Sequence, residues 1–71
     1  MKLQRVRSSA VEAIGYDAER QWLEVRWKGQ QRIYRYYRVP AEVYQELRQA
    51  DSVGTYLNEQ VKRRYFYEPV A

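Results

Sequence analysis

The chain has 71 residues, which form one domain spanning residues 1–71, near the lower limit at which a single core can stabilise a fold. It contains no Cys and no His, which excludes disulfides and thiol chemistry and removes the commonest metal ligand and general base. The net charge of +4 favours polyanionic partners, although it is also an ordinary solubility charge for a small domain. Most of the cations are Arg, which suits bidentate phosphate contact and stacking on bases.

The sequence offers little that would support catalysis, a cofactor or membrane insertion. The hydroxyls of Ser8 and Ser9 lack a base to activate them, and the acidic residues form no fixed pair for hydrolysis. Residues 1–5 lack the apolar run of a signal peptide, and no stretch approaches the roughly 20 apolar residues of a membrane span. We therefore expect a cytoplasmic protein that is not an enzyme and has no cofactor, no metal and no membrane contact.

The N-terminal part of the chain predicts an irregular first strand. Residues 1–9 are a polar lead-in that forms either a frayed end or a short edge strand. Beyond them, Val11 and Ile14 lie an odd number of positions apart, so a regular strand would send them to opposite faces. We expect a bulge near Ala13 that returns both side chains to the same face.

A hairpin follows. Asp17 heads a four-residue turn at residues 17–20, because its carboxylate can bond the backbone two residues further on. This turn places Ile14 opposite Leu23. Residues 22–27 then alternate as a half-buried strand does, with one face made of Leu23, Val25 and Trp27.

Residues 32–39 combine tyrosines, β-branched residues and arginines and predict a third strand that stops at Pro40. A two-residue loop at Gly29 and Gln30 pairs Trp27 with Arg32, Val25 with Tyr34, Glu24 with Arg35, Leu23 with Tyr36 and Trp22 with Tyr37. A shift of one residue would bury an unpaired guanidinium. Tyr34 and Tyr36 should therefore point inward, and the opposite face should carry Trp22, Arg26, Ile33, Arg35 and Tyr37.

Two helices are predicted after this strand. Pro40 opens the first, Glu42 lies in its first turn, and its apolar stripe consists of Val43, Leu47 and Ala50. Ser52 caps the second, whose apolar face consists of Val53, Tyr56, Leu57 and Val61. Gly54 predicts close contact between the helices, and the second helix should end near Lys62. The predicted fold is α+β, a three-stranded antiparallel meander with an optional N-terminal edge strand, followed by two helices packed on one face.

The outward face of this sheet is the first candidate site. If the helices cover only the other side, it presents aromatic rings between guanidinium groups, from Trp22, Arg26, Arg35 and Tyr37. Such a surface can bind single-stranded nucleic acid by stacking and phosphate contact. Two alternatives stay open. Trp22 with Tyr37 and Glu24 with Arg35 are cross-strand pairs that stabilise the sheet, or the face is a protein contact or homodimer seam that uses Trp22, Ile33 and Tyr37.

A second candidate is the densest basic cluster, formed by Lys62, Arg63 and Arg64 beside Tyr65 and Tyr67. These cations suit a phosphate backbone, and they also complement the dipole at the end of the second helix. Tyr34 and Tyr36 could likewise form a stacking platform for unpaired bases or belong to the core. The predicted register favours the core.

The chain resembles the KTSC family, a short domain found at the C-terminus of some lysyl-tRNA synthetases and as stand-alone bacterial proteins. The resemblance is carried by Ser8-Ser9, Val11, Ile14-Gly15-Tyr16-Asp17, Leu23, Val25, Tyr34-Arg35-Tyr36, Val39-Pro40, Val43-Tyr44, Leu47, Ala50, Ser52, Gly54, Tyr56, Asn58 and Tyr65. It implies no defined activity, but the synthetase association suggests RNA binding. We expect a non-enzymatic binding module for nucleic acid, RNA in preference to DNA, that is a monomer or a weak homodimer. Interaction with a protein partner or homodimerisation through the sheet face is the alternative.

Overall fold

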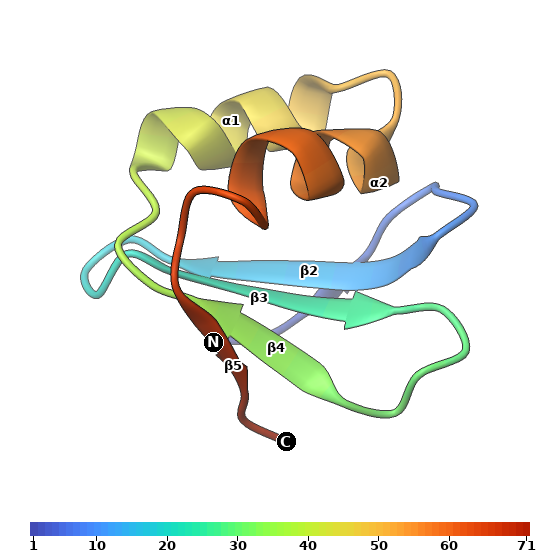
Figure 1. Ribbon diagram of the computed structural model, residues 1–71, viewed down its shortest axis with the longest axis horizontal. Coiled ribbons are helices and arrows are strands. Elements are labelled where there is room, and N and C mark those ends of the chain that lie inside the picture. The colour runs from blue at the N-terminus through green and yellow to red at the C-terminus, as the bar shows by residue number, and fades with distance from the viewer.

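Strands and helices occupy separate layers. The computed structural model describes all residues from 1 to 71, and both helices lie on the same face of one antiparallel sheet (Figure 1). Its five strands are ordered β1-β2-β3-β4-β5 and comprise β1 Gln4–Arg5, β2 Val11–Asp17, β3 Trp22–Trp27, β4 Ile33–Tyr36 and β5 Tyr67–Pro69. The helical layer comprises α1 Ala41–Gln49 and α2 Val53–Tyr56, which continues as the π-helical turn η1 Leu57–Val61.

The α+β class, the central meander and the helices on one face are confirmed, but the sheet has five strands instead of three. The optional N-terminal strand forms as β1, which pairs with β2. The strand β5 was not predicted. It pairs with β4 and brings the C-terminal residues back to the sheet. Its three residues are too few to show a clear alternation, and Pro69 is accepted there because β5 is an edge strand.

The expected bulge is present, because the pairing of β2 with β3 shifts between Val11 and Ala13. Val11 and Ile14 are both buried as a result. Asp17 does head the turn, because its carboxylate accepts hydrogen bonds from the backbone N–H groups of Glu19 and Arg20 at 3.0 and 3.2 Å. The predicted strand pairing is wrong by two residues, because Asp17 still pairs within the strand and Ile14 lies opposite Val25 instead of Leu23. The loop closes later because Gln21 adopts a left-handed backbone with φ of 59°. A shift of two residues keeps every side chain on its predicted face.

The register between β3 and β4 is as predicted, with Leu23 opposite Tyr36, Val25 opposite Tyr34 and Glu24 opposite Arg35. Tyr36 is only 1% exposed, so its core assignment is confirmed. Tyr34 also faces the helices and is half-buried. The core between sheet and helices contains Val11, Ile14, Leu23, Val25, Tyr36, Val39, Leu47, Val53, Leu57 and Val61.

Local signals start both helices where expected. Helix α1 begins directly after Pro40, and the Ser52 hydroxyl accepts a hydrogen bond from the Thr55 backbone N–H at 3.2 Å. Gly54 does allow a close approach, but to a loop and not to the other helix. A Cβ atom at Gly54 would lie 3.1 Å from the Cβ of Ala10. None of the helices is long and apolar enough to span a bilayer.

The buried phenol of Tyr36 makes stability depend on alkaline pH. Burial raises the pKa of Tyr36 to about 12 from an ordinary value of 10.0. Between these values the unfolded phenol ionises while the folded one stays neutral, so the free energy of unfolding should fall as pH rises through that window. Two pKa units correspond to about 3 kcal/mol at most. Urea unfolding of Tyr36→Phe should show a shallower decline from pH 10 to 12, and equal slopes in both proteins would contradict this cause.

Candidate functional site

The outward face of the sheet is held together by contacts among its own side chains. The Nε atom of Arg35 donates to Glu24 Oε2 at 2.8 Å, across the β3–β4 pair. The Arg35 guanidinium carbon lies 3.8 Å from the centroid of the Trp22 ring, a cation–π contact. The Tyr37 ring meets Trp22 edge-on, with centroids 6.1 Å apart. The two cross-strand pairs considered as an alternative are therefore present.

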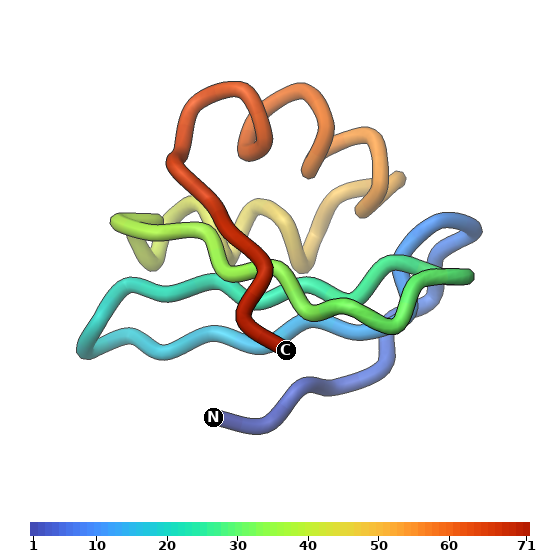
Figure 2. The backbone as a smooth tube through the Cα atoms, turned by 60° about the horizontal axis from the view of Figure 1, so that its bottom comes forward, coloured from blue at the N-terminus to red at the C-terminus, as the bar shows by residue number.

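This face is also less open than expected. The N-terminal segment runs beneath the sheet, on the side away from the helices (Figure 2). A Cβ atom at Gly15 would lie 3.1 Å from Met1 Sδ and 3.2 Å from the Lys2 carbonyl oxygen. The predicted site residues on this face are half-buried, namely Trp22, Arg26, Arg35 and Tyr37. The expectation that the whole face meets solvent is wrong, because residues 1 and 2 cover part of it.

Arg26 lies apart from the other three predicted residues. It pairs with Ile33, two residues along the strands from the Glu24–Arg35 pair, and lines a hollow with Glu12 and Gln31. Its Nε atom is buried without a hydrogen-bond partner. Arg26 therefore lies on the same face but takes no part in the contacts among Trp22, Arg35 and Tyr37.

The corner of the outward face carries an aromatic pair that is open to solvent. The Tyr37 backbone N–H donates to the Phe66 carbonyl oxygen at 2.9 Å, which holds the two residues side by side. Their rings stack with centroids 5.7 Å apart and planes inclined by 28°. Phe66 is 69% exposed. A hollow of about 630 Å³ surrounds this stack, and we call it the corner hollow; it is lined by Tyr37, Arg38, Arg64, Tyr65, Phe66 and Glu68.

Charge and backbone conformation distinguish the corner hollow. Arg38 adopts a left-handed backbone with φ of 58°, which is uncommon for a residue other than Gly and turns the chain out of β4. The Tyr37 hydroxyl donates a hydrogen bond to the Glu68 carboxylate, and this bond raises the pKa of Tyr37. Neither Arg38 nor Arg64 takes part in an ion pair. The exposed Phe66 ring is therefore bordered by two guanidinium groups without an ion pair and by one carboxylate that already accepts a hydrogen bond.

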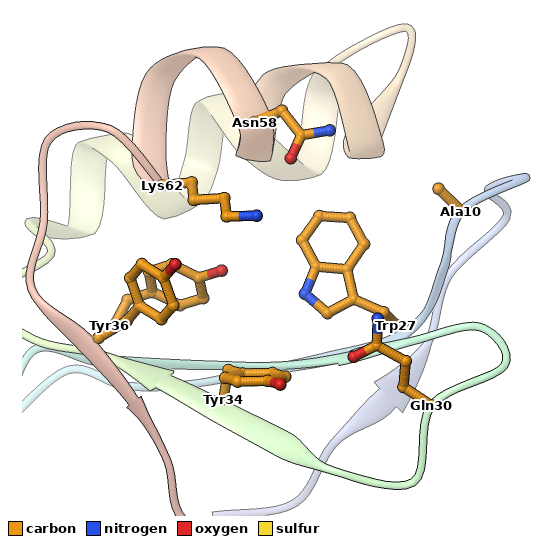
Figure 3. A pocket seen from close by; sticks show the side chains of 8 residues that line it. Ala10, Trp27, Gln30, Tyr34, Tyr36, Asn58 and Lys62 are labelled. Carbon is orange, nitrogen blue, oxygen red and sulfur yellow. The ribbon is translucent and has the colours of Figure 1, made fainter.

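A second cavity lies on the helix side of the sheet. We call it the inner aromatic cavity; its volume is about 390 Å³, and it lies between the sheet and η1 (Figure 3). The aromatic side chains around it are Trp27, Tyr34, Tyr36 and Tyr67. Polar groups come from Gln30, Asn58 and Lys62, and the Lys62 side chain extends from the helix over the cavity.

Two of the three cations of the predicted basic cluster border different hollows. Lys62 lines the inner aromatic cavity, Arg64 lines the corner hollow, and Arg63 is exposed and lines neither. The chain turns at the end of η1, so consecutive side chains point in different directions. The three cations are adjacent in the sequence, but they do not border the same hollow.

Sequence reasoning missed Phe66 and Arg38 as site residues, and it missed the inner aromatic cavity. The available signal for this edge strand was the run of aromatic residues Tyr65, Phe66 and Tyr67, which favour strands, followed by Pro69, which edge strands accept. The left-handed backbone of Arg38 has no sequence signal of its own. The protein holds no cluster of three or more acidic side chains that could ligate a metal ion.

The fold and these cavities define a class: a small α+β domain whose five-stranded antiparallel sheet carries two helices on one face. A family model described as the KTSC domain matches residues 7–65, and the chain belongs to this family. The resemblance inferred from the sequence is thus confirmed.

Relatives and a solved structure agree with this membership. The chain is 46% identical over 63 residues to a protein of Tsukamurella paurometabola, a match covering 89% of this chain and 92% of the relative. It is 41% identical over 66 residues to a protein of Stutzerimonas stutzeri, covering 93% and 92% respectively. It is similar to the crystal structure of a KTSC domain protein from Yersinia pestis, with a TM-score of 0.92 at 28% identity, covering 99% of this chain and 97% of the other.

The Glu24–Arg35 pair should contribute measurably to stability. The side chains of Arg35 and Glu24 are only 24% and 11% exposed. Glu24→Gln keeps the shape but removes the charge, so we expect the free energy of unfolding to fall by about 1 to 3 kcal/mol. Glu59→Gln changes the same charge at an exposed position without an ion pair and should alter stability by less than about 0.5 kcal/mol. Urea unfolding measures both, and equal effects of the two substitutions would refute this role.

Proposed function

We propose that this protein is a non-enzymatic binding module that holds single-stranded RNA at the corner hollow, weakly and with little sequence preference. The observation that carries the proposal is the stack of Tyr37 and Phe66, whose outer ring is 69% exposed. A chain of this size needs its aromatic residues for the core, and an exposed ring stacked on a second ring beside two cations is a candidate binding surface. Every nucleobase has a flat face that can continue such a stack.

Charge supports the same reading. Arg38 and Arg64 border the hollow and make no ion pair, so each guanidinium is free to contact a phosphate. Arg35, in contrast, is already bonded to Glu24 and covers the Trp22 ring, so we assign Trp22 and Arg35 to the stability of the sheet. The preference for RNA over DNA rests on the occurrence of the family in lysyl-tRNA synthetases.

A titration of short single-stranded RNA at two salt concentrations tests the proposal. We expect affinity to fall as salt rises, because phosphate contacts release counterions. Phe66→Ala should cost about 1 to 3 kcal/mol of binding free energy, the usual value of one stacked base. Arg64→Gln should make the slope of log affinity against log salt concentration shallower by about the amount of one phosphate contact. The proposal fails if the unmodified protein shows no salt-dependent affinity.

Two further variants sharpen this test. Arg32→Gln removes an exposed cation in the β3–β4 connection, at the other end of the sheet, and should leave RNA affinity nearly unchanged. Glu68→Gln keeps the acceptor for the Tyr37 hydroxyl but removes a negative charge from the hollow, so it should strengthen binding. Equal losses for Arg32→Gln and Arg64→Gln would mean that net charge alone drives association.

The alternative function is contact with a protein partner or a second copy through the sheet face. The exposed Phe66 ring favours it too, since exposed aromatic groups mark protein contacts as well as stacking sites. Here light scattering should show concentration-dependent association that is lost in a Trp22→Ala, Tyr37→Ala double variant that remains folded. A monomer at all concentrations would remove the homodimer.

A further inference from the structure

We infer that the inner aromatic cavity is a second binding site, which takes one nucleotide with its base against the aromatic side chains and its phosphate at Lys62. The cavity lies on the opposite side of the sheet from the corner hollow, so this inference stands apart from the proposed function. Its volume of about 390 Å³ falls in the range of about 300 to 1,000 Å³ that is usual for small-molecule sites.

The walls of the cavity suit a flat ring. Tyr67 packs against Tyr36 with centroids 4.9 Å apart, and Tyr34 meets Tyr67 edge-on at 6.1 Å. Trp27 stands on the other side, with the N–H edge of its indole turned toward the tyrosines (Figure 3). Tyr36 is fully buried, whereas Trp27, Tyr34 and Tyr67 stay half-buried and keep surface for a ligand. A planar ring that enters here lies against aromatic side chains on more than one side.

The polar groups select the chemistry of that ring. Gln30 and Asn58 each supply an amide donor and a carbonyl acceptor, which can match the hydrogen-bonding edge of a nucleobase. Lys62 takes part in no ion pair, and no Asp or Glu lines the cavity. An unneutralised ammonium group disfavours a cationic ligand and favours an anionic one. A planar heteroaromatic ring that carries a phosphate satisfies all of these groups.

The helix above the cavity has an unusual backbone at the same point. The Lys62 N–H donates to the Leu57 carbonyl oxygen at 2.7 Å, five residues earlier, so η1 closes a π-helical turn. Such turns are rare in proteins, and those that occur are often found at functional sites. Asn58 and Lys62, the two residues that the helix contributes to the cavity, lie at the start and the end of this turn. The widened turn is an observation independent of the aromatic walls.

The same chemistry has two sources: a free 5′-mononucleotide, or one unstacked nucleotide within an RNA strand. NMR of the unmodified protein separates them, because each of its two Trp residues gives an indole N–H signal. A Trp22→Phe variant assigns the Trp27 signal. We expect 5′-AMP or 5′-UMP to shift the Trp27 signal saturably, and inorganic phosphate alone to leave it in place. A shift that appears only with a short single-stranded RNA assigns the site to a base of the strand.

Matched cation variants test the role of Lys62. Lys62→Gln should lower the affinity for the ligand that shifts the Trp27 signal by about tenfold, which equals about 1.4 kcal/mol. Arg63→Gln removes a neighbouring cation that does not line the cavity and should change this affinity by less than about twofold. The inference is overturned if neither mononucleotide nor RNA shifts the Trp27 signal, or if both variants weaken binding equally.

Phe66→Ala distinguishes the two sites. It should weaken RNA binding at the corner hollow and leave mononucleotide binding at the inner aromatic cavity unchanged, because Phe66 does not line that cavity. If mononucleotides bind but Phe66→Ala has no effect on RNA, the proposed function fails and this inference stands. If RNA binding depends on Phe66 while Trp27 responds to no nucleotide, the reverse holds.

Discussion

The ion pair between Arg35 and Glu24 is the interaction on which the arrangement of this protein depends. Both side chains are largely withdrawn from water, with an Nε to Oε2 distance of 2.8 Å. Because side chains alternate along a strand, a slip of one residue in β4 would carry the guanidinium into the core and turn Tyr34 and Tyr36 outward. The pair therefore holds the aromatic side of β4 beneath the helices and its cationic side away from them.

The short strand β5 extends this division to both candidate sites. Tyr67 pairs with Tyr36 and joins the inner aromatic cavity, while the preceding Phe66 lies on the outer side beside Tyr37. The first residue of β5 and the residue just before it thus complete two cavities on opposite faces of the sheet. A protein with a small core can have two aromatic surfaces in this way, because each ring that leaves the core still packs against another ring.

Two expectations from the sequence failed at turns of the chain. The cations Lys62 to Arg64 were expected to form one patch, yet Lys62 and Arg64 line different cavities. Ile14 was expected opposite Leu23 but pairs with Val25, since the backbone of Gln21 allows a later turn. The first expectation took neighbours along the chain as neighbours in space, and the second placed a turn one residue too early. The direction of a side chain at a turn depends on dihedral angles that many residue types can adopt.

The sequence by itself determined the class of fold, the faces of β3 and β4, the bulge and the cap at Ser52, because these follow from the periods of apolar residues and from short-range hydrogen bonds. It also contained the residues that carry the family. Only the tertiary structure decided that β5 returns to β4, that Met1 covers part of the outward face, and that Phe66 stays in solvent. Those features are contacts between segments far apart in the chain, whose free energies depend on the whole packed arrangement and leave no periodic trace in the residues themselves.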